Sequence, residues 1–177
     1  MNYEKLEKNI INIVKENQLK LGYRREKMQL FYPMSSINRV LDTNLAVDQM
    51  QAALFDYFSS DLTCLKDTGI SHKGERFMFL ISEETCEYVH DNIPQQDFMK
   101  DFIHAVAEHG CTVDKLRDIF YSYSDRVYFE KADNREFDYL AYFLDGDIDD
   151  AMYCITDEGH HVIYHRYTRE EYAYFGF

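Results

Sequence analysis

The sequence contains no tryptophan, only two prolines and seven glycines in 177 residues, and four cysteines that lie far apart. Scarce proline and glycine exclude collagen-like and low-complexity chains, which depend on these residues. The cysteines form no C-x-x-C pair, so their spacing supports neither a structural zinc site nor thioredoxin-like chemistry. We therefore predict no metal site built on these cysteines and no cofactor.

Long hydrophobic runs are also missing. The longest unbroken one is FMFLI at residues 77–81, far short of the roughly 20 residues that a membrane-spanning helix needs. Residues 1–5 are charged and lack the apolar stretch of a secretory signal. We expect a cytoplasmic protein with reduced thiols and no membrane partner.

Acidic side chains outnumber basic ones in this sequence. Lys and Arg total 19 against 32 Asp and Glu, which gives a formal net charge of −13. Residues 1–70 carry nine of each sign, so residues 71–177, with ten basic and twenty-three acidic side chains, carry the whole excess. This acidity repels nucleic acids and anionic membranes. It favours a basic protein partner, or self-association through a basic patch.

The hydrophobic pattern predicts helices first and strands last. Helical spacing indicates helices over 3–21, 47–62, 94–109 and 112–123, a short one from Ser35 or Ser36 to Leu41, and another after Ser82. Strands are predicted at 28–32 and 75–81, with a loop at 69–74. Four aromatic and β-branched runs then alternate with acidic turns, at 126–131, 137–144, 150–156 and 161–167. Thr168 begins a last short helix with a capping box.

This order predicts an α+β fold, with a helix-rich N-terminal two-thirds packed on a C-terminal antiparallel β-meander. No linker, repeat or low-complexity tract interrupts the chain. We predict a single compact domain over residues 1–177, with a helical subdomain over residues 1–70 as the alternative.

The last predicted hairpin carries two histidines four residues apart. On a helix, His161 and His165 would hold one zinc ion, but residues 162–164 (VIY) favour a strand, where the two side chains stand about 13 Å apart. A three-residue turn at 157–159 would place Tyr153 opposite Ile163. Tyr153, His161 and His165 then share the more open face, which is either exposed sheet or the floor of a pocket.

Two further clusters are candidate ion sites. A basic island at residues 20–39 contains a single acidic residue, and a helix start within it offers free N–H groups, so an anion site is predicted at Arg24, Arg25, Ser36 and Arg39. The turn at residues 145–150 (DGDIDD) imitates part of a calcium loop but lacks its glycine and its final glutamate. A solvated acidic turn is the favoured interpretation, and cation binding there stays open.

Residues 32–41 (YPMSSINRVL) and 155–167 (ITDEGHHVIYHRY) resemble stretches of an uncharacterised bacterial family of unknown function. The resemblance spans most of the chain. It implies a soluble bacterial protein and carries over no activity, ligand or catalytic residue.

No complete catalytic motif is present, and ten of the fifteen tyrosines follow residue 120. We therefore predict an acidic cytosolic binding or protein-interaction module without catalytic activity, with a tyrosine-rich sheet as its surface. The alternative is a small-ligand-binding protein or enzyme that uses either the hairpin face or the anion site. The ligand is not predicted.

Overall fold

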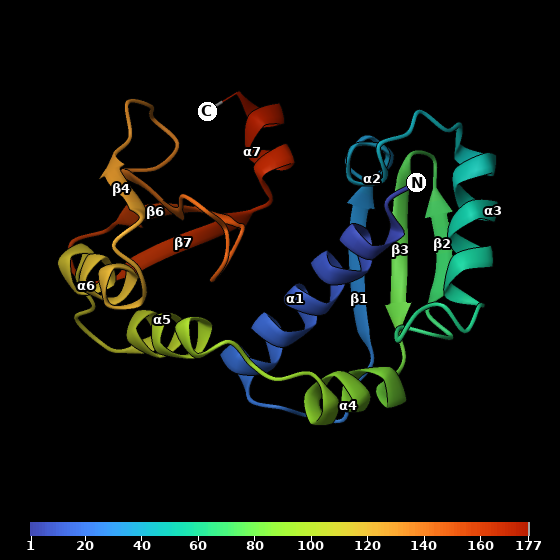
Figure 1. The fold of residues 1–177 in the computed structure, drawn as a ribbon, viewed down its shortest axis with the longest axis horizontal. Helices are drawn as coiled ribbons and strands as arrows, with labels where there is room; N and C mark the ends of the chain where they lie inside the picture. The colour runs from blue at the N-terminus through green and yellow to red at the C-terminus, as the bar shows by residue number, and fades with distance from the viewer. Residues whose placement is uncertain (177) are drawn as a thin grey trace. The chain divides into compact units, whose positions relative to one another are not determined.

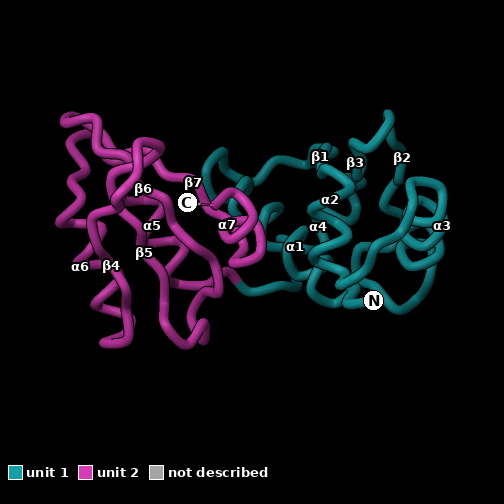
Figure 2. Tube along the Cα trace, turned by 90° about the horizontal axis from the view of Figure 1, so that it is seen from above, with its two compact units in different colours: residues 1–94 teal, residues 95–177 magenta. Residues whose placement is uncertain are grey.

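The computed structural model describes residues 1–176 and divides into two compact units, residues 1–94 and residues 95–177 (Figure 2). The predicted single domain over residues 1–177 stays a prediction. Residues 1–70 do not form a separate helical subdomain, because the strand Met28–Pro33 pairs along its whole length with a strand that follows residue 70.

The first unit combines four helices with a three-stranded antiparallel sheet in the order β1-β3-β2 (Figure 1). Its elements are α1 (Tyr3–Leu21), β1 (Met28–Pro33), α2 (Met34–Leu41), α3 (Val47–Phe58), β2 (Gly69–Lys73), β3 (Arg76–Ile81) and α4 (Glu83–Asn92). Figure 1 shows α1 and α3 running alongside these strands. Helix α3 ends at Phe58, four residues before the end of the helix predicted over 47–62.

The predicted loop at 69–74 is wrong, because residues 69–73 form the edge strand β2. Its register pairs Ile70 with Phe79 and Lys73 with Arg76, which leaves Gly74 and Glu75 as a two-residue turn. Gly74 has φ +58°, a conformation that favours glycine and that the common tight hairpin turns require. Backbone pairing with β3 makes this polar segment a strand, although its composition does not indicate one.

The core of the first unit lies between its helices and one face of its sheet. Helix α1 contributes Leu6, Ile10 and Val14, spaced four apart, all fully buried. Strand β3 contributes Phe77 and Phe79, which alternate with half-buried residues. Residues four apart share one face of α1, and residues two apart share one face of β3. Both faces therefore direct their apolar side chains into one core.

The second unit contains the predicted β-meander, which is confirmed. Four antiparallel strands follow in the order β4-β5-β6-β7. The elements are α5 (Asp97–Ala107), α6 (Val113–Tyr123), β4 (Val127–Lys131), β5 (Tyr139–Phe143), β6 (Met152–Asp157), β7 (Val162–Tyr167) and α7 (Arg169–Phe175). Thr168 caps α7 as predicted: its side chain accepts a hydrogen bond from the Glu171 N–H.

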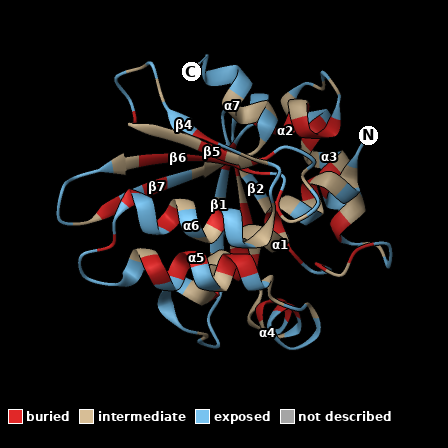
Figure 3. Cartoon of the chain, turned by 60° about the vertical axis from the view of Figure 1, so that its left-hand side comes forward, coloured by how far each residue is buried: buried red, intermediate tan, exposed pale blue. Residues whose placement is uncertain are grey.

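Helices α5 and α6 cover one face of the meander with aromatic rings. Phe98 and Phe120 lie 4.8 Å apart between ring centroids, and each also contacts Phe143 and Tyr153 edge-on or tilted. Buried residues accordingly form a stripe along both helices (Figure 3). Edge-to-face packing of this kind adds specific stabilisation to the area that is buried.

With helices leading the chain and two antiparallel sheets, the fold is α+β, as predicted. Among residues 1–176, no helix has both the length and the apolar character that crossing a bilayer requires.

Candidate functional site

The hairpin of β6 and β7 has a different register from the predicted one. Asp157 pairs with Val162 and Tyr153 pairs with Arg166, so residues 158–161 form a four-residue connection. The turn is one residue longer and begins one residue later than predicted, so Tyr153 pairs three positions further along the chain and shares its face with different side chains. The strand prediction for the histidine-bearing segment is nevertheless confirmed, because β7 spans Val162–Tyr167.

Tyr153 is fully buried in the aromatic core and does not lie on an open face. Its hydroxyl donates a hydrogen bond to Asp149 Oδ2 at 2.6 Å. The same carboxylate accepts hydrogen bonds from Arg166 Nη2 and from the Ala151 N–H. Because these donors satisfy both carboxylate oxygens, this cluster is structural rather than a ligand site.

The two predicted histidines lie apart from Tyr153 and do not converge. His165 is exposed on β7 and pairs with Cys154, so both residues lie on the face of the sheet opposite to the one that holds Tyr153. His161 belongs to the turn, where its Nε2 lies 2.9 Å from the Glu158 carboxylate. The structure therefore forms no common site from Tyr153, His161 and His165.

The face of the meander that α5 and α6 leave uncovered is rich in tyrosine. The strand registers place Tyr128, Tyr142 and Tyr167 together on it. Tyr128 and Tyr142 stack with ring centroids 4.9 Å apart and an interplanar angle of 18°. Burial raises the pKa of the Tyr172 hydroxyl on α7, and electrostatic interaction with Cys154, Tyr128 and Tyr142 raises it further. We name these four residues, Tyr128, Tyr142, Tyr167 and Tyr172, the tyrosine face.

Carboxylates and one cation border the tyrosine face. Burial raises the pKa of the Tyr167 hydroxyl, and the nearby charges of Glu171 and Glu136 raise it further. Arg169 Cζ lies over the Tyr142 ring, 5.3 Å from its centroid, while its Nη2 donates to the Phe143 carbonyl. The face thus already holds one guanidinium on an aromatic ring, an arrangement favoured by the negative ring surface.

The sequence shows aromatic residues in this region but does not identify the members of the tyrosine face. Alternation within each strand would predict which tyrosines share a face, provided that the pairing between strands were known. That pairing depends on turn lengths, and the turn of the last hairpin was predicted one residue too short.

The four residues of the predicted anion site are not brought together. Arg24 and Arg25 precede β1, whereas Ser36 and Arg39 follow it, and a six-residue strand spans roughly 20 Å. Ser36 is buried inside α2, which begins at Met34 after Pro33 rather than at a serine cap. Arg25 instead lies 3.6 Å from the Glu87 carboxylate.

Two of the four aspartates in the acidic turn at residues 145–150 pair with arginines. Asp149 is buried against Arg166, and Asp145 Oδ2 lies 3.6 Å from Arg126 Nη1. Within the part of the chain that the structure describes, no group of three or more histidine, cysteine, aspartate or glutamate side chains is arranged to hold a metal ion.

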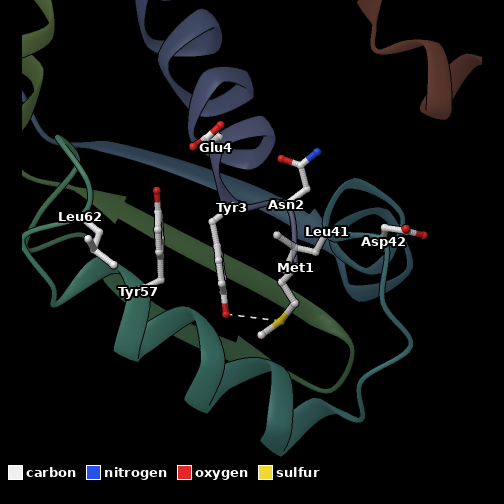
Figure 4. A pocket seen from close by; sticks show the side chains of 8 residues that line it. All are labelled: Met1, Asn2, Tyr3, Glu4, Leu41, Asp42, Tyr57 and Leu62. Atoms are coloured by element: carbon white, nitrogen blue, oxygen red, sulfur yellow. Dashed lines mark hydrogen bonds between the residues drawn. The ribbon is translucent and has the colours of Figure 1, made fainter.

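A cavity of about 650 Å³ opens beside the start of α1 in the first unit (Figure 4). Tyr3 and Tyr57 form one wall, with parallel rings 4.3 Å apart. The Tyr57 hydroxyl donates to Glu7 Oε2 at 2.6 Å, and the Tyr3 hydroxyl lies within hydrogen-bond distance of the Ala53 carbonyl. Since these hydroxyls already have protein partners, the wall offers apolar surface more than polar recognition.

The comparisons with known proteins identify a family and no function. No curated protein and no solved structure matches the chain. One family model matches residues 3–175, and its description reads "Domain of unknown function, E. rectale Gene description (DUF3877)". The resemblance to an uncharacterised bacterial family is thereby confirmed, and the chain belongs to this family of unknown function.

Proposed function

We propose that the protein is a cytoplasmic binding module without a catalytic step, and that its tyrosine face accepts an arginine- or lysine-bearing segment of a partner protein. The observation that carries this proposal is Arg169, whose guanidinium lies 5.3 Å from the centroid of Tyr142. A partner's arginine would occupy the neighbouring rings in the same manner.

The charge of the second unit supports a basic partner. Residues 95–177 carry eighteen Asp and Glu against eight Lys and Arg, whereas residues 1–94 carry fourteen against eleven. Ten of the thirteen excess negative charges therefore belong to the unit that contains the tyrosine face. Such a field raises the association rate of a basic partner and disfavours an acidic one.

The exposed members of the face give the partner something to contact. Tyr128 is 37% exposed, and Ile163, which lies on the same side of the meander but outside the tyrosine face, is 38% exposed. Glu130, on the same face of β4 as Tyr128, is also exposed. Aromatic rings beside a carboxylate suit the apolar stem and charged head of arginine.

The proposal is tested with two dye-labelled peptides, one alternating arginine with glycine and the other alternating glutamate with glycine. Fluorescence anisotropy measures their affinity for the full-length protein at low and high salt. We expect saturable binding of the arginine peptide only, weakened by salt because screening shortens the reach of the charges. Equal affinity for the two peptides contradicts the proposal.

Matched variants locate the contact. Tyr128→Ala should weaken arginine-peptide binding about two- to fivefold, the size of an exposed cation–π contact. Tyr121→Ala is the control, because Tyr121 is similarly exposed, at 46%, but lies on α6, which packs against the opposite face. An equal loss in both variants shows that the tyrosine face is not the binding surface.

A further inference from the structure

A second concavity, of about 300 Å³, lies in the first unit between the end of α1, the loop at residues 22–27 and α4. Gly22 ends α1 with φ +72°, and the chain then turns back toward β1. This turn places Arg24 and Lys27 in the wall of the pocket that Gln18 of α1 and Cys86 of α4 also line.

Gln18 is buried there with one half of its amide unused. Its side chain is only 8% exposed, and its Nε2 donates to the Cys86 carbonyl at 2.9 Å. Its Oε1 is buried and accepts no hydrogen bond from any residue of the described chain. Buried acceptors nearly always have a donor, so this oxygen marks a place where a partner is missing.

A second polar atom without a partner belongs to the same loop. Tyr23 stacks on His90, with ring centroids 4.0 Å apart and an interplanar angle of 8°. Its buried hydroxyl has no hydrogen-bond partner among residues 1–176. Two unsatisfied polar atoms, Gln18 Oε1 and the Tyr23 hydroxyl oxygen, thus belong to residues five apart in the chain, one at the end of α1 and one in the loop that follows it.

The charge of the pocket wall is positive in an acidic protein. Arg24 and Lys27 contribute two positive charges and Glu26 one negative charge, with Arg24 Nη1 4.0 Å from Glu26 Oε1. The Cys86 thiol stays protonated near neutral pH, because burial raises its pKa. The wall therefore favours an anion.

We propose that this pocket binds a small organic anion that also carries a hydroxyl or amino donor. The donor pairs with Gln18 Oε1, and the anionic group lies against Arg24 and Lys27. The volume is at the lower end of the range of ligand sites, so the ligand is a small hydroxy acid, amino acid or phosphate ester rather than a dinucleotide. This site is independent of the tyrosine face.

Four probes test the proposal by calorimetry on the full-length protein: malate, succinate, glycerol 3-phosphate and inorganic phosphate. Malate differs from succinate by one hydroxyl, so their comparison isolates the donor. We expect malate to bind about fivefold more tightly than succinate, or glycerol 3-phosphate to exceed phosphate by the same factor, as one neutral hydrogen bond allows. No binding by any probe, or equal affinity within both pairs, overturns the proposal.

Three variants assign the affinity to residues. Gln18→Met should remove the preference for the hydroxylated probe, and a preference that persists in this variant overturns the proposal. Lys27→Gln, at an exposed position, should weaken both members of a pair and preserve their ratio. Lys73→Gln removes a charge from β2, outside this pocket wall, and should change nothing.

Should Gln18→Met not fold, NMR of the unaltered protein decides the question. The Gln18 side-chain amide resonances should shift on addition of malate and much less on addition of succinate. Shifts confined to other residues contradict the site.

Discussion

Arg166 and Asp149 meet in a buried ion pair in the second unit. Arg166 Nη2 lies 2.8 Å from Asp149 Oδ2, and the two side chains are 9% and 1% exposed. Strand β7 supplies the arginine, and the turn before β6 supplies the aspartate. Burial on this scale removes the screening that makes surface pairs weak, so each charge depends on the other.

Asp149→Asn should therefore destabilise the protein strongly. The change leaves the Arg166 guanidinium buried without its carboxylate, and breaking such a pair lowers the free energy of unfolding by about 3–5 kcal/mol. Urea denaturation followed by circular dichroism measures this loss.

Asp145→Asn is the matched control in the same turn. Asp145 pairs with Arg126, whose side chain is 68% exposed, so the loss should stay within about 1 kcal/mol. Similar losses in the two variants would show that Asp149 stabilises the turn without depending on Arg166.

Substitutions at Tyr153 should separate its hydroxyl from its ring. Tyr153→Phe keeps the contacts with Phe98 and Phe102 and removes the hydroxyl, which donates to Asp149 and contacts Met99 Sδ, so it should lower the free energy of unfolding by about 1–2 kcal/mol. Tyr153→Ala also leaves a cavity and should lower it by about 3–5 kcal/mol. Equal losses by urea denaturation would contradict this division.

Glu7 should make stability depend on pH in the acid range. Burial alone would raise its pKa, but hydrogen bonds from Tyr57, Thr63 and Cys64 outweigh burial and hold the pKa below its ordinary value of 4.5. A lowered folded-state pKa contributes stability that is present above pH 4.5 and is lost as pH falls through the folded-state value.

Glu7→Gln removes the titrating group and serves as the test. Its free energy of unfolding should fall below that of the unaltered protein near neutral pH, and the difference should shrink as pH drops below about 4.5. A difference that is constant from pH 7 to pH 3 would exclude a role for Glu7 ionisation.

The four cysteines should react slowly with thiol reagents in the native protein. All four are free, and burial raises the pKa of Cys64 and of Cys154 to about 12. With pKa values this high, few of these thiols are ionised at pH 8. Reaction is then slow, because the thiolate is the reactive species. Ellman's reagent should label all four rapidly in denaturant and none rapidly without it; fast native labelling of one thiol would contradict its raised pKa.

Much of the secondary structure could be predicted from local sequence, because its causes are local. Ser82 and Thr112 cap the helices that follow them, each accepting a hydrogen bond from a backbone N–H three residues later. The alternating runs after residue 126 correctly indicated the meander. Strand β2 was missed because it is polar and depends on pairing with β3, which lies outside its own segment.

The candidate sites, too, depend partly on local sequence and partly on tertiary packing. The sequence placed a basic island at Arg24 and Arg25, but it could not connect Arg24 with Gln18, since that pairing depends on how α1 meets α4 and where the loop returns. It also placed Tyr153 on an open face, whereas Tyr153 is buried against Phe98 of α5 and Phe120 of α6.

By itself, the sequence determined where most helices lie, the caps at Ser82, Thr112 and Thr168, the meander and the acidic charge of the chain, because each depends on neighbouring residues or on composition alone. Only the tertiary structure decided which tyrosines share a face and where Gln18 lies. Those relationships depend on strand register and helix packing, which bring together residues that are distant in the chain.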